Sequence, residues 1–191
     1  MISRPVLLIG TLAVALVALG YVTTVRGHTE QRGRAYLHVG CGDVIEPPAK
    51  VTAQDARDKL LCLTNYERQQ HGLPPVTRNA QLEIASDKMS QDMVARRFFD
   101  HDTPEGITPQ QRIDAAGYNA PQGWTGENIA WGGGSDGSVA AQMDKLMHSP
   151  GHRENILRPQ FREMGVGIAY GRPEGKTSGP RAMTITTDFG G

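Results

Sequence analysis

The sequence lacks an excess of charge of either sign, because 20 Lys and Arg residues balance 20 Asp and Glu residues. It also has no stretch in which basic residues gather along the chain. Proteins that bind nucleic acid neutralise the phosphates with clustered Lys and Arg side chains. The composition therefore argues against a nucleic-acid partner.

Cysteine is scarce as well, since the chain contains only Cys41 and Cys62. Two cysteines alone do not make a metal site of familiar spacing. In an oxidising compartment they can pair, which closes a loop of about 20 residues and stabilises the fold by roughly 3 kcal/mol. A disulfide and two free thiols both remain open at this point.

Long apolar runs are absent apart from one, at residues 5–25, which follows Arg4 and carries no charge. A basic start, an apolar run and small residues at Ala18 and Gly20 are typical of a cleaved export signal. The run also has about the length of roughly 20 residues that crosses a bilayer, so residues 1–26 are a signal peptide or an uncleaved membrane anchor. Both interpretations predict a protein that is secreted or anchored on the outer side of the cytoplasmic membrane, with membrane contact only through this segment.

The remaining length suits one ordinary domain, and no internal repeat is visible in the 191 residues. Residues 27–51 are polar, contain Gly and end near a Pro-Pro pair, which predicts a linker. The folded domain is predicted to span residues 52–191.

Apolar residues at helical spacing, each preceded by a good capping residue, predict four helices in this domain. The helices are expected to start after Thr52, Asn79, Thr108 and Ser138. Residues 132–137 are predicted to be a flexible loop, and residues 165–170 and 182–189 are predicted to be paired strands. Helices first and paired strands last predict an α+β fold with an antiparallel sheet.

Three side chains could carry chemistry, namely His101, Glu127 and His152. Two imidazoles and a carboxylate are the ligands of an open zinc site, although the residues lie 26 and 25 positions apart and not on one helix. A purely structural polar network is the alternative, because a buried polar group that loses its partner costs about 1–3 kcal/mol. His148 is spaced for a helical pair with His152, but Pro150-Gly151 is predicted to break that helix.

Seven short motifs follow one another along the chain, and none is decisive alone. They are Asn65-x-x-Arg68-x-x-x-Gly72, Asn79-x-x-Leu82-x-x-Ala85-Ser86, Phe99-x-His101, Arg112-x-x-x-x-Gly117-Tyr118, Gly126-Glu127-Asn128-Ile129, Ser149-Pro150-Gly151-His152-Arg153-x-Asn155 and Gly165-Val166-Gly167. In this order they resemble the CAP superfamily of cysteine-rich secretory, antigen and pathogenesis-related proteins (the SCP-like domain). The resemblance covers about residues 56–190 and is closest to the bacterial, cysteine-poor branch.

The resemblance implies an α-β-α sandwich with a small antiparallel sheet between helices. It also implies a cleft with two histidines and two glutamates that can bind a divalent metal such as zinc. His101, Glu127 and His152 match three of these four positions. The second glutamate is missing, because its position falls near His148 or Ser149.

As a function, the resemblance implies an exported binding module for a small ligand, a lipid or a cell-surface component. The alternative is a metal-assisted hydrolase acting on peptide or cell-wall material, with Glu127 as a metal ligand or as the general base. A purely structural surface protein is a third interpretation.

Overall fold

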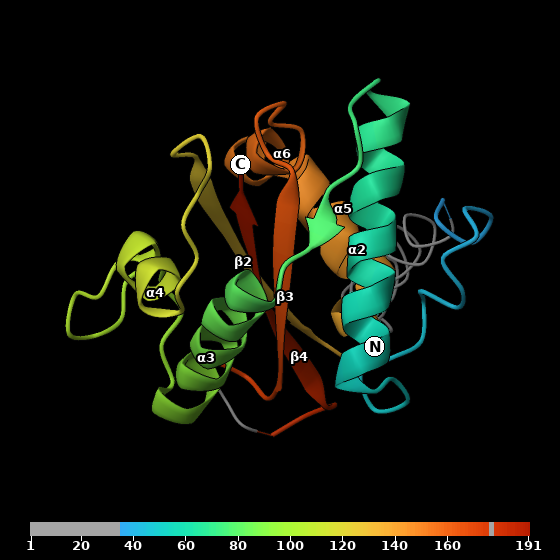
Figure 1. Cartoon of the computed structure of the whole chain (residues 1–191). Helices are drawn as coiled ribbons and strands as arrows, with labels where there is room; N and C mark the ends of the chain where they lie inside the picture. The colour runs from blue at the N-terminus through green and yellow to red at the C-terminus, as the bar shows by residue number, and fades with distance from the viewer. Residues whose placement is uncertain (1–34, 176–177) are drawn as a thin grey trace, which may run out of the picture.

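The computed structural model of the chain describes residues 35–175 and 178–191 (Figure 1). The signal peptide or anchor predicted at residues 1–26 lies outside the described residues. Within the part that is described, no helix has the length and apolar character needed to cross a membrane.

The predicted helices begin at the predicted capping residues. The described helices are α2 (Ala53–Gln70), α3 (Ala80–Arg96), α4 (Pro109–Ala115), α5 (Val139–His148) and α6 (Pro150–Ile156). The side chains of Thr52, Asn79, Thr108 and Ser138 each accept a backbone N–H of the following first turn. Such N-caps satisfy amide groups that have no partner inside the helix, and this explains why the local sequence sets the helix starts.

The sheet is larger and more mixed than the sequence predicted. Its strands are β1 (Thr77–Arg78), β2 (Thr125–Gly133), β3 (Glu163–Tyr170) and β4 (Ala182–Gly190), in the order β1-β3-β4-β2. The antiparallel pairing of β3 with β4 is confirmed, and β2 pairs antiparallel with β4 along its whole length. The short β1 runs parallel to β3 at the other edge.

The predicted flexible loop at residues 132–137 is wrong in part. Residues 132–133 end β2, and residues 134–137 form a short 3-10 helix. A Cβ atom on Gly132 would lie 2.1 Å from the carbonyl oxygen of Asp136, so the glycine permits this tight return of the chain. Gly132 therefore allows the end of β2 to pack directly against the backbone of the 3-10 helix.

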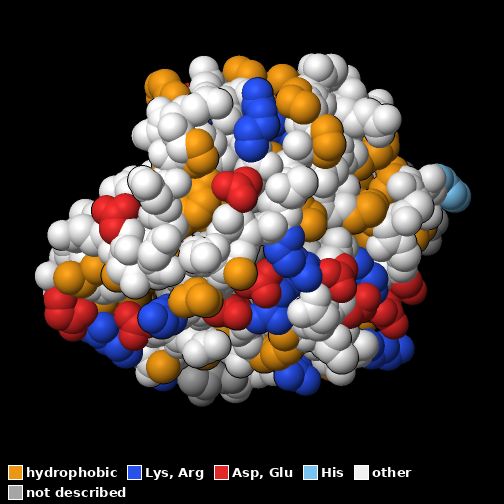
Figure 2. Space-filling model, in the orientation of Figure 1, with side chains coloured by type: hydrophobic (Ala, Val, Ile, Leu, Met, Phe, Trp, Pro, Cys, Tyr) orange, Lys and Arg blue, Asp and Glu red, His pale blue; other side chains and the backbone are white. Residues whose placement is uncertain are grey.

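Helices cover both faces of the sheet, which confirms the α-β-α sandwich (Figure 1). One face carries α3, with α4 packed beside it. On the other face, α2, α5 and α6 contribute to the main apolar core together with alternate residues of β3 and β4. The face in Figure 2 mixes acidic and basic side chains over its lower half, in keeping with the balanced composition.

Two glycines of β3 let α3 lie directly on the sheet. A Cβ atom on Gly165 would come within 2.1 Å of the Leu82 backbone, and one on Gly167 within 2.0 Å of the Ser86 carbonyl oxygen. Ser86 and Ser90 face the sheet from α3, and Ser90 donates a hydrogen bond to the Gly167 carbonyl. The small residues on both elements thus bring α3 close enough to hydrogen-bond to the strands.

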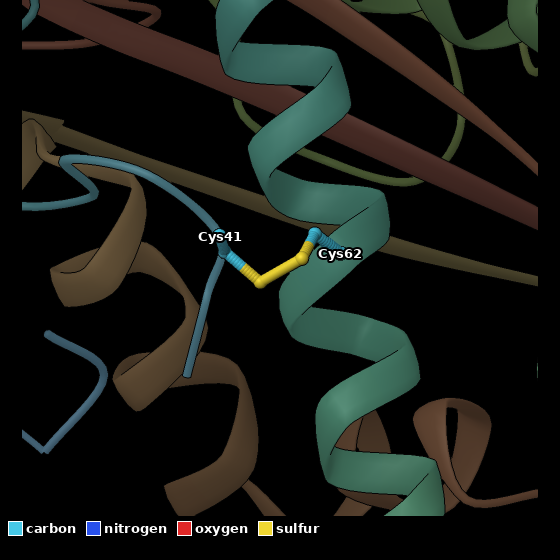
Figure 3. Close-up of a disulfide and its surroundings, with 2 residues drawn as sticks. All are labelled: Cys41 and Cys62. Carbon is cyan, nitrogen blue, oxygen red and sulfur yellow. A yellow bond between two sulfur atoms is a disulfide. The ribbon is translucent and has the colours of Figure 1, made fainter. Parts of the chain in front are cut away.

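The segment before α2 packs onto the domain. Tyr36, Cys41 and Val44 are buried in the main core, and Cys41 forms a disulfide with Cys62 of α2 across a Cα–Cα distance of 5.7 Å (Figure 3). The pairing of the two cysteines is therefore confirmed. The described part of the predicted linker, residues 35–51, contributes side chains to the core.

Candidate functional site

The three candidate residues come from three separate elements. His101 lies in the turn after α3, Glu127 lies on β2, and His152 lies in the first turn of α6. The Nδ1 atom of His101 is 2.8 Å from Oε1 of Glu127. The backbone carbonyl of His152 accepts a hydrogen bond of 3.0 Å from the Asn128 side chain, which fastens α6 to β2. The structure therefore joins His101 directly to Glu127 and places His152 on the neighbouring helix end.

The second oxygen of Glu127 is bound by an arginine that the sequence analysis did not select as a site residue. Nη2 of Arg112, on α4, lies 2.5 Å from Oε2 of Glu127. Nη1 of the same guanidinium donates to the Ile107 carbonyl at 2.9 Å. The side chains of Arg112 and Glu127 are only 10% and 2% exposed. Arg112 belongs to the motif Arg112-x-x-x-x-Gly117-Tyr118, but the spacing of that motif does not show that its guanidinium contacts Glu127.

A second carboxyl group lies beside Glu127. Asp188 of β4 is the direct cross-strand partner of Glu127 and is fully buried. Its Oδ2 accepts a hydrogen bond from Ser86 at 2.8 Å, whereas its buried Oδ1 has no donor within the described residues. Burial, followed by the negative charge of Glu127, raises the pKa of Asp188 well above its usual range. The surroundings of Asp188 therefore favour its neutral, protonated form.

Asp188 also escaped the sequence analysis. The only hint was one acidic residue in a strand otherwise made of apolar residues, Thr and Gly. Its pairing with Glu127 depends on the register of β2 against β4, and β2 was not predicted as a strand.

The two imidazoles have opposite pKa shifts. The hydrogen bond to Glu127 raises the pKa of His101, although partial burial opposes the rise. Burial lowers the pKa of His152, and the nearby charge of His101 lowers it further. The site thus favours one charged imidazole and one neutral imidazole.

The predicted helix break between His148 and His152 is confirmed, because α5 ends at His148 and α6 begins at Pro150. His148 turns back toward Asp144, with Nδ1 2.8 Å from its carbonyl oxygen. It lines a separate hollow of about 850 Å³ together with Arg153 and Leu157. Nothing in these contacts makes His148 a substitute for the missing glutamate.

Asn155 builds the wall between α6 and β2. Its side-chain amide donates to the Glu127 carbonyl at 3.1 Å and to the Asn128 side-chain oxygen at 2.9 Å. A Cβ atom on Gly126 would lie 2.9 Å from the same Asn155 side chain, which explains the glycine at that position. Arg153 is exposed and contacts His71 of the helix cap. Asn155 and Arg153 therefore connect α6 to β2 and to the end of α2.

The donor set does not fit the predicted metal centre. In residues 35–175 and 178–191, no three His, Cys, Asp or Glu side chains gather in a way that could hold a metal ion. Both oxygens of Glu127 are already engaged, one by His101 and one by Arg112. The ligand set predicted at His101, Glu127 and His152 is therefore not assembled as a three-ligand group.

The model of the CAP family, described as the cysteine-rich secretory protein family, matches residues 61–186. The chain is 37% identical over 120 residues to the uncharacterized protein YkwD of Bacillus subtilis (strain 168), covering 63% of this chain and 44% of that protein. It is 26% identical over 178 residues to the uncharacterized membrane protein YlbC of the same organism, covering 87% and 50%. The chain thus spans about half the length of these relatives.

Solved structures show the same fold. An extracellular protein of Bacillus anthracis str. Ames that contains an SCP domain superposes with a TM-score of 0.59 at 27% identity, covering 72% of this chain and 41% of that chain. An outer surface protein of Borrelia burgdorferi also gives a TM-score of 0.59, at 19% identity, covering 73% and 95%.

Proposed function

The chain belongs to the CAP, or cysteine-rich secretory protein, family, and from that premise we propose that it is an exported binding module whose cleft takes a small polar ligand. The similarity to an extracellular protein with an SCP domain supports the export. The ligand belongs to the cell-surface material that an exported domain meets.

One observation carries the proposal: an exposed imidazole is held by a buried carboxylate. The side chain of His101 is 46% exposed, whereas that of Glu127 is 2% exposed. A buried ion pair is weak support for stability, because removing charges from water costs about as much as their attraction returns. A role in presenting His101 to a ligand accounts for the arrangement better than fold stability does.

The chemistry of His101 defines the class of ligand. Its Nδ1 is used by Glu127, and its Nε2 has no hydrogen-bond partner among the residues that the structure describes. The raised pKa of His101 favours the imidazolium, whose Nε2–H donates a hydrogen bond. A carboxylate or carbonyl oxygen is the matching acceptor, so the ligand is a small acid or amide, such as a peptide fragment. These polar groups favour such a ligand over a lipid.

The alternative function is a hydrolase acting on peptide or cell-wall material. It requires Glu127 as a metal ligand or as a base for water. The surroundings of Glu127 do not favour it, because its side chain is only 2% exposed and each oxygen already has a partner, His101 or Arg112.

The test is an NMR titration of the histidine ring signals of the full-length protein in mild detergent. The probes are sodium acetate, a short acidic peptide and a soluble peptidoglycan fragment. We expect at least one probe to shift the signals of His101 and His152 in a saturable way, and the His101→Ala variant to lose this binding. The matched control is His71→Ala, which removes an exposed histidine that contacts Glu67 and Arg153 at the end of α2.

The outcomes separate the two functions. Unchanged binding in His101→Ala, or no saturable shift with any probe, overturns the binding proposal. Cleavage of a peptide or peptidoglycan probe that is lost in Glu127→Gln replaces it with the hydrolase.

A further inference from the structure

We propose that the guanidinium of Arg112 takes the place of a metal ion in this cleft, so that the protein carries its own permanent cation. This inference concerns what holds the site together and does not depend on which ligand binds. Its failure would leave the ligand test above unaffected.

The position of Arg112 supports this role. Its Nη2 contacts Oε2 of Glu127 at 2.5 Å, while His101 contacts the other oxygen at 2.8 Å. A buried carboxylate needs a compensating cation or a set of hydrogen-bond donors. An arginine supplies both, because it stays charged at all accessible pH values and offers several N–H groups.

The neighbours of Arg112 fix it in place. Its Nη1 donates to the Ile107 carbonyl, just ahead of α4, and Arg112 itself lies on α4. The helix begins with a capping box formed by Thr108 and Gln111, so its position is well determined. The guanidinium is therefore held on Glu127 by the fold and does not sample the surface freely.

A divalent ion at Glu127 would face two obstacles. It would have to displace either His101 or Arg112 from a carboxylate oxygen, and it would lie next to the positive guanidinium. Like charges a few ångströms apart repel strongly in a poorly solvated site. In addition, His148, near the position of the missing fourth ligand, is turned toward Asp144.

Removing the guanidinium should convert the same residues into a cation site. In Arg112→Gln, Oε2 of Glu127 loses its charge partner while the imidazole of His101 stays beside Oε1, which leaves one carboxylate and one imidazole for a cation whose other ligands are water. Carboxylate and imidazole groups are suitable zinc ligands. A divalent ion would then supply the positive charge that the variant lacks.

The experiment is a zinc titration of the full-length protein in mild detergent, followed by thermal unfolding. We expect no saturable stabilisation of the parent protein. We expect Arg112→Gln to start with a lower Tm and to rise on the order of 5 °C at zinc 100-fold above Kd, with reversal by chelator. The double variant Arg112→Gln/His101→Ala should lose the rise.

Arg57→Gln is the matched control. Arg57 forms a partly buried ion pair with Asp87 at 2.7 Å, and Glu83 lies nearby, but no imidazole of the described residues takes part. Zinc should not stabilise this variant, although it also exposes unpaired carboxylates. Equal stabilisation of Arg57→Gln and Arg112→Gln would overturn the inference, since any unpaired carboxylate would then suffice.

The parent protein provides a test that needs no variant. Zinc should leave the ring signals of His101 unchanged in its NMR spectrum. Saturable zinc binding at His101 with Arg112 in place would show that the guanidinium does not replace the metal. A folded Arg112→Gln that gains no zinc response would overturn the inference as well.

Discussion

Two buried arginines, Arg68 and Arg112, are held in different ways. Arg68 is fully buried on α2, and its guanidinium donates to four backbone carbonyls and, among the residues that the structure describes, to no carboxylate. The acceptors are the carbonyls of Pro74, Ile156, Arg158 and Phe161, at 2.8 to 3.0 Å. Arg112 binds one carboxylate and one carbonyl, and its buried Nε has no partner within the described residues.

The difference separates a structural network from a candidate functional one. The carbonyls around Arg68 do not titrate, and they join the end of α2 to the segment after α6. The groups around Arg112 titrate and lead to the surface through His101, which is 46% exposed. Arg68 therefore fixes the backbone, whereas Arg112 holds a set of side chains whose charges depend on pH.

The largest expected effect comes from breaking the Arg68 network. Arg68→Met would strand the Ile156 and Phe161 carbonyls, both in fully buried bonds. At about 1–3 kcal/mol for each stranded group, we expect a loss on the order of 4 kcal/mol, nearly independent of pH. Urea denaturation at pH 5.5 and 8 measures this loss.

The control for Arg68 is Arg78→Met. Arg78 forms a partly exposed ion pair with Asp58, which should contribute less than about 1 kcal/mol. Similar losses in stability for the two variants would show that the carbonyl network around Arg68 contributes no more than a partly exposed ion pair.

Arg112→Met should cause the next largest loss in the free energy of unfolding, and the size of this loss should depend on pH. Breaking a buried ion pair costs about 3 kcal/mol, because the carboxylate of Glu127 loses its cation. Protonation of His101, whose pKa is raised by its hydrogen bond to Glu127, places a positive charge beside that carboxylate, so the loss should shrink as the pH falls. Urea denaturation from pH 4.5 to 8 tests this, and a loss that stays constant would make Arg112 a structural residue of the same kind as Arg68.

Asp188→Asn should change how the free energy of unfolding varies with pH more than it changes that free energy at any single pH. The pKa of Asp188 is raised in the fold, so its stabilising contribution is present below the usual Asp value and is lost as the pH rises toward the raised pKa. In that window the stability falls by about 1.4 kcal/mol for each pH unit. Asparagine stays neutral, so the variant should lose this slope and be at least as stable as the parent at pH 7.

Asp58→Asn is the control for Asp188. Despite slight burial, hydrogen bonds from Arg78 and Gln54 lower the pKa of Asp58. Replacing the Asp58 carboxylate should therefore change the slope of stability against pH in the direction opposite to that of Asp188→Asn. A parent protein whose stability does not fall between pH 4.5 and 7 relative to Asp188→Asn would contradict the raised pKa of Asp188.

His101→Asn should have the smallest effect. The raised pKa of His101 means that its contribution is complete below the unfolded value near 6.5 and disappears as the pH rises through the folded value. Because the ring is 46% exposed, solvent screening keeps the contribution to about 0.5 kcal/mol or less.

Thermal unfolding from pH 5 to 9 measures the effect of His101→Asn. His152→Asn is the matched variant, because the lowered pKa of His152 makes its protonation destabilising. The two variants should therefore diverge at low pH, with His101→Asn less stable than the parent and His152→Asn more stable. Parallel curves of Tm against pH for the two variants would show that protonation of the two imidazoles has the same effect on stability.

The sequence predicted the helices well because their starts depend on local chemistry. Thr52, Asn79, Thr108 and Ser138 cap their own first turns, so nearest neighbours determine those boundaries. Strand β2 was missed for the opposite reason. Its residues include Gly126, Gly132 and Gly133, which have low strand propensity, and it is held by its long ladder with β4.

The candidate site was predictable in part. The resemblance placed His101 and Glu127 in one cleft, and they are in contact. Arg112 and Asp188 were missed because their contacts depend on the docking of α4 and on strand register. Both are long-range features that no local pattern encodes.

The disulfide has a mechanical consequence. Cys41 precedes α2 in sequence and is covalently joined to Cys62, in the middle of that helix. Tension applied to the chain ahead of Cys41 would enter α2 at Cys62 through the sulfur bridge. Residues 42–61 lie inside the closed loop and would bear none of that load. A pull on the N-terminal side would therefore reach the second half of α2, which carries Arg68, without first peeling away the segment that contains Val44.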